Sequence, residues 1–508
     1  MNSKRVLISV YDKEGVVDFA RGLKELGWEL ISTGGTKKTL EEANIDVLDV
    51  QQLTGFPEVF DGRVKTLCPQ IFAGILYRRS SESDQQIMEE LQLSSIDMVV
   101  NTLYPFVDTL RDPNSSEQDI LEKIDIGGPS MIRGAAKNHR DVIIVTSIGQ
   151  YNRVLELLRS DQMDERQRKS LAAEAFAVTA AYEIAIANHY AKDLIEPQDD
   201  LFLHYTGGRE LRYGENPQQR AKFFRSAEPG GLKDAIVHQG KALSYNNLLD
   251  ASAAIEFIRE FQEQPTAIAI KHTNPCGIAS AENLEIAYQA CYEADSESIF
   301  GGIVVVNGQI TSPVAEKMTE IFLELVIAPS FTEEALGIFR KKPNLRVIEI
   351  PTLLESQMGE RQLREVSGGM LQQDADLELY EQLNCVTKRQ PTEGELEELL
   401  FAYRVAKCVK SNGIAITKNR RTIGLGVGQV NRYFAVQQAL KQAGENAKGG
   451  VVASDGFFPF ADSIRELAEA GIQAVIQPGG SIKDQDSIEV CDEKDMTMVY
   501  TAMRHFRH

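Results

Sequence analysis

Short apolar runs alternate with helical stretches along the first 190 residues of the chain. Buried strands are predicted at four of these runs: Val6–Val10, Glu29–Ser32, Met98–Val100 and Val142–Thr146. Helices are predicted at three stretches: Glu14–Glu25, Lys37–Ala43 and the alanine-rich Ala172–Ala191. This alternation predicts an α/β fold in which helices cover both faces of a parallel sheet.

The alternation resumes after residue 200. The polar stretch Glu196-Pro197-Gln198-Asp199-Asp200 predicts a boundary between a first region, residues 1–197, and a second region, residues 198–508. An acidic stretch, Asp374–Glu398, predicts a connector that divides the second region into halves of about 198–373 and 374–508. Strand-then-glycine turns in both halves indicate a duplicated α/β unit. Buried strands of the second region are predicted at Ile268–Ile270, Ile303–Val306, Leu345–Ile350, Gly413–Thr417, Gly450–Ala453 and Ala474–Ile476.

Length and charge narrow the possible functions. A chain of 508 residues exceeds one hydrophobic core, so two or three domains are expected. The formal net charge of -20 argues against a nucleic-acid partner or an anionic membrane surface, and any anionic ligand needs a local basic cluster. The six cysteines are scattered without a C-x-x-C pair, which is neither a zinc pattern nor a disulfide framework. With no apolar leader and no uninterrupted apolar run of membrane length, we expect a cytoplasmic protein.

One strand of the second region leads into candidate catalytic side chains. The run Ile268–Ile270 is followed by Lys271 and His272 and then by Pro275 and Gly277, which predicts a strand ending in a turn at the rim of a sheet. Open α/β sheets build their sites there. A neighbouring ammonium disfavours protonation of an imidazole, so His272 is expected to be available as a base. The alternative is a capped strand end whose lysine points into solvent.

A glycine pair in the first region predicts an anion site. The strand Glu29–Ser32 leads into Thr33-Gly34-Gly35-Thr36 and then into a helix. Such a turn brings backbone N–H groups and a helix N-terminus to one ligand. Ser9 and Lys13 follow the first strand, and we expect them to face the same crevice. Ordinary turn chemistry is the alternative.

Further side chains add to this candidate site. Arg63 and Lys65 are two residues apart, which places them on one face of an extended segment. Tyr104 follows an apolar run, and Asp125 precedes a Gly-Gly-Pro turn and a helix that carries Lys137. Asp125 also fits a helix N-cap, and Lys137 also fits a solvated helix face.

Taken in chain order, these segments resemble a known family. Ser-Thr-Gly-Gly-Thr (32–36), Gly-Arg-Val-Lys-Thr (62–66), Leu-Tyr-Pro-Phe (103–106), Asp-Ile-Gly-Gly-Pro (125–129) and Ala-Ala-Lys-Asn-His (135–139) resemble the IMP cyclohydrolase half of the bifunctional purine enzymes that also carry AICAR transformylase. The resemblance implies a methylglyoxal-synthase-like parallel-sheet domain with Lys65, Tyr104, Asp125 and Lys137 as catalytic residues. It implies substrate contacts for Ser9, Lys13, Ser32, Thr33, Gly34, Gly35, Thr36, Arg63, Thr66, Asn101, Thr102, Ile126 and Gly127.

These residue types suit the implied reaction. In FAICAR a carboxamide nitrogen attacks a formyl carbonyl of the same molecule, and water then leaves to give IMP. Holding the two groups face to face supplies much of the rate. Cationic or phenolic donors stabilise the developing alkoxide and protonate the departing hydroxyl.

The second region resembles the AICAR transformylase half of the same family. The motifs that carry the resemblance extend to the last residue of the chain: Arg-Tyr-Gly-Glu-Asn-Pro (212–217), Lys-His-Thr-Asn-Pro (271–275), Phe-Gly-Gly (300–302), Ile-Ala-Pro (327–329), Lys-Ser-Asn (410–412), Ser-Asp-Gly-Phe-Phe-Pro-Phe (454–460), Pro-Gly-Gly-Ser (478–481) and Arg-His-Phe-Arg-His (504–508). Departures from the family pattern include Thr273, Ser252 and Tyr433.

The resemblance implies roles in formyl transfer. His272 is the implied base for the substrate amine, Lys271 stabilises the oxyanion, and Asn412 orients the imidazole or the formyl oxygen. Core packing is the alternative for part of Phe457–Phe460, and a frayed end is the alternative for the C-terminal residues. Implied substrate contacts are Arg212, Tyr213, Gly301, Glu324, Arg432, Phe457, Asp462, Gly479, Gly480 and Arg504.

The family also implies cofactors, partners and a fold for this region. The expected fold is a duplicated cytidine-deaminase-like α/β unit without zinc ligands. The expected co-substrate is 10-formyltetrahydrofolate, with no metal or redox cofactor, and the other ligands are AICAR, FAICAR and IMP. A homodimer with transformylase sites shared between subunits is expected. The alternative function is a purine-nucleotide-binding relative that is non-catalytic or retains only the cyclohydrolase.

Overall fold

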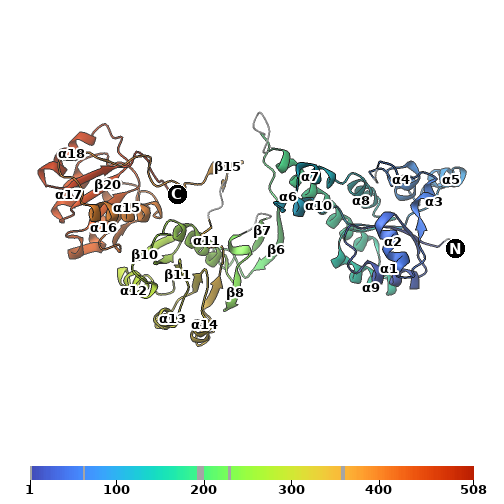
Figure 1. Ribbon diagram of the computed structural model, residues 1–508, viewed down its shortest axis with the longest axis horizontal. Coiled ribbons are helices and arrows are strands. Elements are labelled where there is room, and N and C mark those ends of the chain that lie inside the picture. The colour runs from blue at the N-terminus through green and yellow to red at the C-terminus, as the bar shows by residue number, and fades with distance from the viewer. Residues whose placement is uncertain (1–2, 61–62, 192–198, 227–229, 356–360) are drawn as a thin grey trace. The chain divides into compact units, whose positions relative to one another are not determined.

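Five parallel strands form the sheet of the N-terminal unit. Figure 1 shows the computed structural model as a ribbon, coloured along the chain. The structure describes residues 3–60, 63–191, 199–226, 230–355 and 361–508. The chain divides into two units, residues 1–204 (unit 1) and residues 205–508 (unit 2). The predicted domain boundary at residues 197 and 198 lies outside the described residues.

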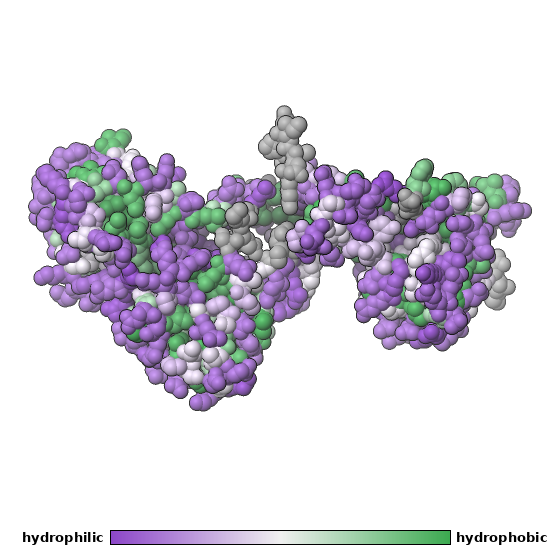
Figure 2. Space-filling view, viewed as in Figure 1, coloured by the Kyte–Doolittle hydropathy of each residue, from purple (hydrophilic) through white to green (hydrophobic). Residues whose placement is uncertain are grey.

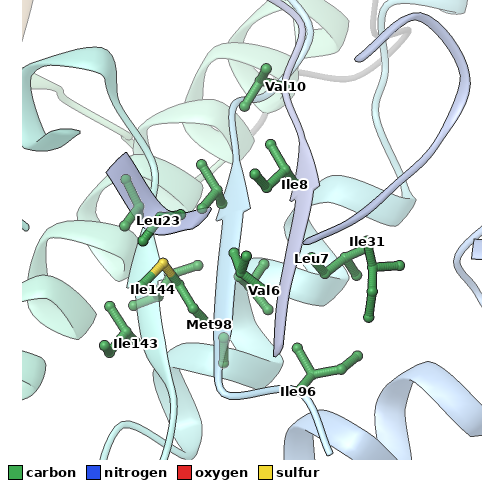
Figure 3. Close-up of a cluster of buried hydrophobic side chains, with 14 of the residues drawn as sticks. Val6, Leu7, Ile8, Val10, Leu23, Ile31, Ile96, Met98, Ile143 and Ile144 are labelled. Carbon is green, nitrogen blue, oxygen red and sulfur yellow. The ribbon is translucent and has the colours of Figure 1, made fainter. Parts of the chain in front are cut away.

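The strands predicted for unit 1 are present with small shifts at their ends, and all four neighbouring pairs are parallel. Their apolar side chains, including Val6, Ile8 and Met98, pack into the buried core shown in Figure 3. Burial on both faces explains why these strands read as continuous apolar runs. The strands are β1 (Arg5–Ser9), β2 (Glu29–Ser32), β3 (Leu48–Asp49), β4 (Met98–Asn101) and β5 (Ile143–Val145), in the order β3-β2-β1-β4-β5.

Two helices of unit 1 begin earlier than predicted. α2 begins at Gly34, with Thr33 as its N-cap residue, so the glycine pair belongs to the first helical turn. α10 begins at Glu165 because Asp164 caps it, its carboxylate accepting a hydrogen bond from the backbone of Gln167 at 2.8 Å. The helices are α1 (Val16–Glu25), α2 (Gly34–Glu42), α3 (Val50–Thr54), α4 (Pro69–Leu76), α5 (Glu82–Glu90), α6 (Phe106–Arg111), α7 (Glu117–Glu122), α8 (Gly127–Lys137), α9 (Tyr151–Arg159) and α10 (Glu165–Tyr190).

By length and composition, α10 is the one described helix that could cross a membrane. It packs against α8 and β5, and it buries Leu171, Ala172 and Ala175 in the unit 1 core. A helix packed onto a core passes the same test of length and composition.

Unit 2 contains two six-stranded mixed sheets of the same topology. Taken from the hairpin end, β10-β9-β11-β12-β13-β8 and β18-β17-β19-β20-β21-β16 each show two antiparallel, two parallel and one antiparallel pairing. The strands of the first sheet are β8 (Ile236–Gln239), β9 (Thr266–Lys271), β10 (Asn274–Ser280), β11 (Ile303–Val306), β12 (Leu325–Ala328) and β13 (Arg346–Glu349). Those of the second are β16 (Asn384–Cys385), β17 (Ile414–Thr417), β18 (Thr422–Gly426), β19 (Val451–Ser454), β20 (Ala474–Gln477) and β21 (Thr497–Tyr500).

The helices of unit 2 repeat in the same order between these strands, which confirms the predicted duplication. One core cluster contains residues of both halves, including Ile268 and Ala415. The corresponding pairs are α11 (Tyr245–Arg259) with α15 (Glu393–Lys407), α12 (Leu284–Ala294) with α16 (Arg432–Ala443), α13 (Ser312–Thr319) with α17 (Asp462–Glu469), and α14 (Glu333–Phe339) with α18 (Asp484–Glu493). Two separate hairpins complete the unit: β6 (Tyr205–Leu211) with β7 (Ala221–Ser226), and β14 (Arg361–Val366) with β15 (Gly369–Asp374).

The segment around His272 differs from its prediction. β9 ends at Lys271, and His272 and Thr273 form a two-residue turn, so Pro275 and Gly277 lie inside β10 rather than in a closing turn. The two turn residues have φ values of 54° and 60°, the left-handed region that such hairpins use. The prediction was wrong because glycine or asparagine normally marks such turns, and proline normally argues against a strand. β10 is the outermost strand of its sheet, where proline is tolerated.

The predicted connector Asp374–Glu398 is only partly irregular, because it includes β16 and the first turn of α15. Thr392 and Glu395 form a capping box at the start of this helix. Acidic residues in a first helical turn are favoured by the helix dipole, and in the sequence they look the same as a solvated linker.

Gly277 allows α12 to lie close to β10. A Cβ atom at this position would lie 2.5 Å from the carbonyl oxygen of Cys291. We expect Gly277→Ala to lower the free energy of unfolding of unit 2 by about 1–3 kcal/mol, because backbone must move. Gly394→Ala in α15 is the matched control, since no atom of the described ranges lies within 4 Å of its added Cβ. Urea unfolding measures both, and equal stabilities for the two variants would contradict this packing.

Candidate functional site

A cavity of about 610 Å³ opens at the carboxyl ends of the unit 1 strands. Ser9 ends β1 and Asn101 ends β4, so the parallel sheet itself brings these positions together. The sequence-predicted residues that line the cavity are Ser9, Lys13, Thr33, Gly35, Thr36, Arg63, Lys65, Thr66, Asn101, Thr102, Tyr104, Asp125, Ile126 and Gly127.

Two lysines flank the N-terminus of α2 at this cavity. A Cβ atom placed on Gly34 would lie 4.0 Å from Nζ of Lys65, and one placed on Gly35 would lie 3.9 Å from Cε of Lys13. The first turn of α2 has no acidic residue, and its N-cap side chain makes no capping hydrogen bond. Burial, and then the charge of Lys65, lower the pKa of the Lys13 ammonium. Two ammonium groups beside a free helix N-terminus form a site for an anion.

Several polar side chains at this cavity already form hydrogen bonds within the protein. Oγ1 of Thr36 donates to the carbonyl of Val10 at 3.0 Å, and Oγ1 of Thr102 accepts from the backbone N–H of Tyr11 at 2.8 Å. The amide nitrogen of Asn101 donates to the carbonyl of Ser9 at 2.8 Å. Its amide oxygen is buried and has no hydrogen-bond partner among the residues that the structure describes. Asn101 therefore offers an acceptor to a ligand in this cavity.

Asp125 is both a cavity residue and a helix-capping residue. Its Oδ1 accepts a hydrogen bond from the backbone of Gly128 at 2.8 Å, in the first turn of α8. Its own backbone N–H donates to the hydroxyl of Tyr182 on α10 at 2.8 Å. Burial raises the pKa of the Asp125 carboxyl. The hydrogen bond from the N–H of Gly128 and the charge of Lys65 act in the opposite direction and lower this pKa in part. Both readings of Asp125 from the sequence are therefore compatible with its position.

Asp125→Asn should make unit 1 more stable at neutral pH. Because burial raises the pKa of this carboxyl in the folded state, its contribution to stability is fully present below the unfolded-state pKa. That contribution is lost as the pH rises through the folded-state value. Asparagine keeps an acceptor for Gly128 and carries no charge. Thermal unfolding between about pH 4 and pH 8 should show that the variant melts at a higher temperature than the wild type, by a margin that grows with pH. A lower melting temperature of the variant at neutral pH would contradict this prediction.

Some predicted residues of unit 1 lie outside the cavity lining. The hydroxyl of Ser32 is buried and donates to the carbonyl of Ile8 at 2.7 Å, so it joins two strands. Gly34 is in the first turn of α2 but does not line the cavity. Lys137 is exposed at the last position of α8. It is about 15 Å along the helix from the cavity residue Gly127.

The structure adds cavity residues that the sequence did not indicate. The ring of Tyr11 lies edge-on to that of Tyr104 with centroids 5.7 Å apart, and Nζ of Lys123 lies 5.4 Å from the centroid of Tyr11. Glu122 pairs with Arg63, its Oε2 accepting from Nε at 3.3 Å. These contacts join segments far apart in the chain, so no local spacing marked them.

In unit 2, Lys271 and His272 sit at the β9–β10 hairpin. Nζ of Lys271 donates to the carbonyl of Phe300 at 3.0 Å. The side chain of His272 is exposed. The backbone carbonyl of His272 accepts a hydrogen bond from the side-chain amide of Asn274 at 2.9 Å. The ammonium is therefore held at the sheet rim rather than free in solvent, and the imidazole is accessible to a ligand.

Asn412 belongs to a buried network. Its amide nitrogen donates to the carbonyl of Gln429 at 2.7 Å, and its oxygen accepts from Arg432 at 2.7 Å. Arg432 also pairs with Asp455 at 2.5 Å, and both side chains are buried. Arg432 was predicted as a substrate contact. Its guanidinium is bonded to protein groups, which makes it a support for Asn412.

The other predicted residues of unit 2 are spread over both halves. Arg212 is exposed, with its guanidinium 5.4 Å from the ring centroid of Tyr213. Gly301 has a φ of 73°, and Glu324 pairs with the buried Arg346 at 2.5 Å. Phe457 is exposed, whereas the neighbouring Phe458 is fully buried, as expected for part of this aromatic run. Asp462 is exposed at the start of α17, and Gly479 and Gly480 have φ values of 75° and 101°.

The C-terminal residues are held in place rather than frayed. His505 is buried, with Nδ1 2.6 Å from Asp376 and Nε2 2.9 Å from the carbonyl of Leu379. The backbone N–H of Ser411 donates to the carbonyl of Arg507 at 2.8 Å. The tail is thus bonded to the segment that carries Asn412. Arg504 is exposed beside Phe506, with its guanidinium 4.8 Å from the ring centroid.

Figure 2 shows polar surface over most of the visible face, with local apolar areas. A second cavity of about 320 Å³ in unit 2 is lined by Arg404 and Arg420, which pair with Glu263 and Glu397. In the part of the chain that the structure describes, no group of three or more His, Cys, Asp or Glu side chains could hold a metal ion.

Comparisons with known proteins match this arrangement over the whole chain. The family profile described as AICARFT/IMPCHase bienzyme matches residues 135–442, and the profile described as MGS-like domain matches residues 15–130. The chain is 49% identical over 514 residues to the bifunctional purine biosynthesis protein PurH of Streptococcus mutans, with all of both chains covered. It is 47% identical over 511 residues to the protein of the same name from Oceanobacillus iheyensis, again with complete coverage.

The two profile matches cover parts of both units, because the bienzyme match begins within unit 1, at residue 135, and ends within unit 2, at residue 442. The MGS-like match falls within the parallel-sheet unit, and the bienzyme match covers more than half of the chain. The chain therefore belongs to the AICARFT/IMPCHase bienzyme family, the bifunctional AICAR formyltransferases and IMP cyclohydrolases of purine biosynthesis.

Proposed function

We propose that unit 1 closes FAICAR to IMP and that unit 2 transfers a formyl group from 10-formyltetrahydrofolate to AICAR. The observation that carries the proposal is the unit 1 cavity, where Lys13, Lys65, the α2 N-terminus and Asp125 converge. A cationic cavity in a chain of net charge -20 is the local basic cluster that a nucleotide phosphate requires.

For ring closure, the phosphate of FAICAR binds at the α2 N-terminus beside Lys13. The carboxamide nitrogen attacks the formyl carbon, a C–N bond forms, and the carbonyl oxygen takes up a proton. Lys65 stabilises the developing alkoxide. Tyr104 then protonates the hydroxyl, and the C–O bond breaks as water leaves. The formamide nitrogen forms the C=N bond and loses its proton, which returns to Tyr104. Asp125 accepts the proton that the carboxamide nitrogen loses. The predicted catalytic role of Lys137 requires its ammonium to reach this cavity from the exposed end of α8.

For formyl transfer, the amine of AICAR attacks the formyl carbon of the folate. His272 takes the amine proton, Lys271 stabilises the tetrahedral oxyanion, and the C–N bond to the folate breaks as its nitrogen is protonated. The exposed imidazole and the ammonium at the same hairpin support these roles. Asn412, fixed by Arg432 and Gln429, orients the formyl oxygen through its remaining amide proton. Arg212, Glu324, Phe457 and Arg504 remain proposed contacts of nucleotide or folate.

We also propose that the protein acts in the cytoplasm as a homodimer. Every residue of the β14–β15 hairpin except Leu363 is exposed, including Met370 and Leu371. An isolated two-stranded hairpin is marginal in water, which supports its being covered by a second copy. Sedimentation equilibrium should give twice the mass of the chain, and a monomer at micromolar concentration would reject the dimer.

Two assays on the purified protein test the proposed function. AICAR with 10-formyltetrahydrofolate tests formyl transfer, and FAICAR alone tests ring closure, each followed by absorbance. The proposal requires both activities. Ring closure alone would reduce the chain to a cyclohydrolase, and nucleotide binding without turnover would reject both catalytic assignments.

A further inference from the structure

The turn that presents His272 has an unfavourable backbone conformation. His272 and Thr273 both have positive φ, and a β-branched residue such as threonine is rarely found there. Residues in such conformations persist where the surrounding structure over-determines them. The two-residue turn therefore needs an anchor beyond the pairing of β9 with β10.

Asp250, on the neighbouring helix α11, provides that anchor. Its Oδ1 accepts a hydrogen bond from the backbone N–H of Thr273 at 2.7 Å, and the backbone N–H of His272 also interacts with it. Hydrogen bonds from N–H groups to a carboxylate are stronger than those to a neutral acceptor. Asp250 is partly buried on the helix and lies within electrostatic range of the imidazole.

The second half of unit 2 contains the same carboxylate anchor, but its turn has no histidine. Glu398 on α15 accepts a hydrogen bond from the backbone of Arg420 at 2.7 Å, in the β17–β18 turn. Asn419 and Arg420 have φ values of 55° and 52°, so this turn has the same form. α15 corresponds to α11, and β17–β18 to β9–β10. The carboxylate anchor thus belongs to the duplicated fold, and only the first copy presents an imidazole.

We propose that Asp250 is a positioning residue for formyl transfer, holding the β9–β10 turn so that His272 faces the reacting amine. It acts through the turn backbone and does not touch the substrate. This inference rests on the proposed role of His272 as base. A displacement of about 1 Å at a reacting group costs on the order of 100-fold in rate, so loss of the anchor is costly even if the fold persists.

The test compares Asp250→Ala with Glu398→Ala in the full-length protein. Each variant removes one carboxylate anchor from one copy of the same turn. We expect Asp250→Ala to lower kcat for formyl transfer about 10- to 100-fold, with little change in KM for AICAR. Glu398→Ala should keep kcat within about twofold, because its turn carries no imidazole. Urea unfolding and KM for AICAR are measured in both preparations as a check of the folding of unit 2.

Asp250→Asn is the conservative variant that separates positioning from charge. Its amide oxygen still accepts the N–H of Thr273, so we expect kcat within about threefold of wild type. Equal losses in Asp250→Ala and Glu398→Ala would overturn the inference, as would a full rate in Asp250→Ala or a loss in Asp250→Asn as large as in the alanine variant. If His272→Ala kept the full rate, the proposed base itself would fail. A loss in His272→Ala without one in Asp250→Ala would overturn only the positioning role.

Discussion

His272→Ala is expected to lower the rate of formyl transfer to AICAR by about 100- to 10,000-fold, the usual contribution of a positioned general base. The amine of AICAR is a weak nucleophile because its lone pair is delocalised into the ring, so proton removal has to accompany its attack. His272 is exposed at the β9–β10 turn, one residue from an ammonium that is bonded to the carbonyl of Phe300. Steady-state rates with saturating AICAR and 10-formyltetrahydrofolate measure the effect.

The matched control for this variant is Asn419→Ala. Asn419 occupies the same turn position in the second copy, with φ of 55° against 54° for His272. Its replacement should leave formyl transfer unchanged, and both variants should close FAICAR at the wild-type rate. A variant at position 272 that retained even a third of the activity would assign proton removal to another group.

Much of the secondary structure could be predicted from the sequence, because most strands of the three large sheets are buried and form apolar runs. Runs such as Glu29–Ser32 and Ile303–Val306 are strands with the predicted bounds, β2 and β11. Their boundaries are clear because polar or glycine residues follow the apolar runs at once. Short strands such as β3, with two residues, carry no comparable signal.

The sequence also predicted which residues gather in the unit 1 cavity, for a reason that lies in the sheet. Parallel strands end at one edge, so residues that follow β1 and β2 must meet there, as Lys13 and Thr33 do. Lys137 shows the limit of this reasoning. Its catalytic role came from the resemblance, and α8 carries it away from that edge to an exposed position.

Contacts between segments that are far apart in the chain could not be predicted from the sequence. Asp250 and Thr273 meet because α11 packs beside β9, and neither residue has a local spacing that marks the pair. The same holds for the tail, where His505 is fixed by Asp376. The hairpin turn at His272 was not predicted because histidine and threonine are not the residues that usually form such turns. The carboxylate of Asp250, which lies outside the hairpin, stabilises the turn.

Lys65→Met should lower the rate of FAICAR cyclisation by about 100- to 1,000-fold, the loss seen when one donor to a developing oxyanion is removed. The ammonium of Lys65 lies close to the first turn of α2, and its charge acts on both Lys13 and Asp125. Its removal also changes those neighbours. The pKa of Lys13 should rise toward its ordinary value, and that of Asp125 should rise further because the charge opposing burial is gone.

The pH dependence distinguishes these effects from a general loss of structure. If ionised Asp125 accepts the substrate proton, the acid limb of the residual cyclisation activity should move to higher pH in Lys65→Met. Lys38→Met is the matched control, because Lys38 lies on α2 with its side chain 79% exposed and pairs loosely with Glu42, at 3.9 Å. It should retain the wild-type rate and profile. Formyl transfer by unit 2 should persist in both variants, and its loss in Lys65→Met would mean that the two activities are not separable by unit.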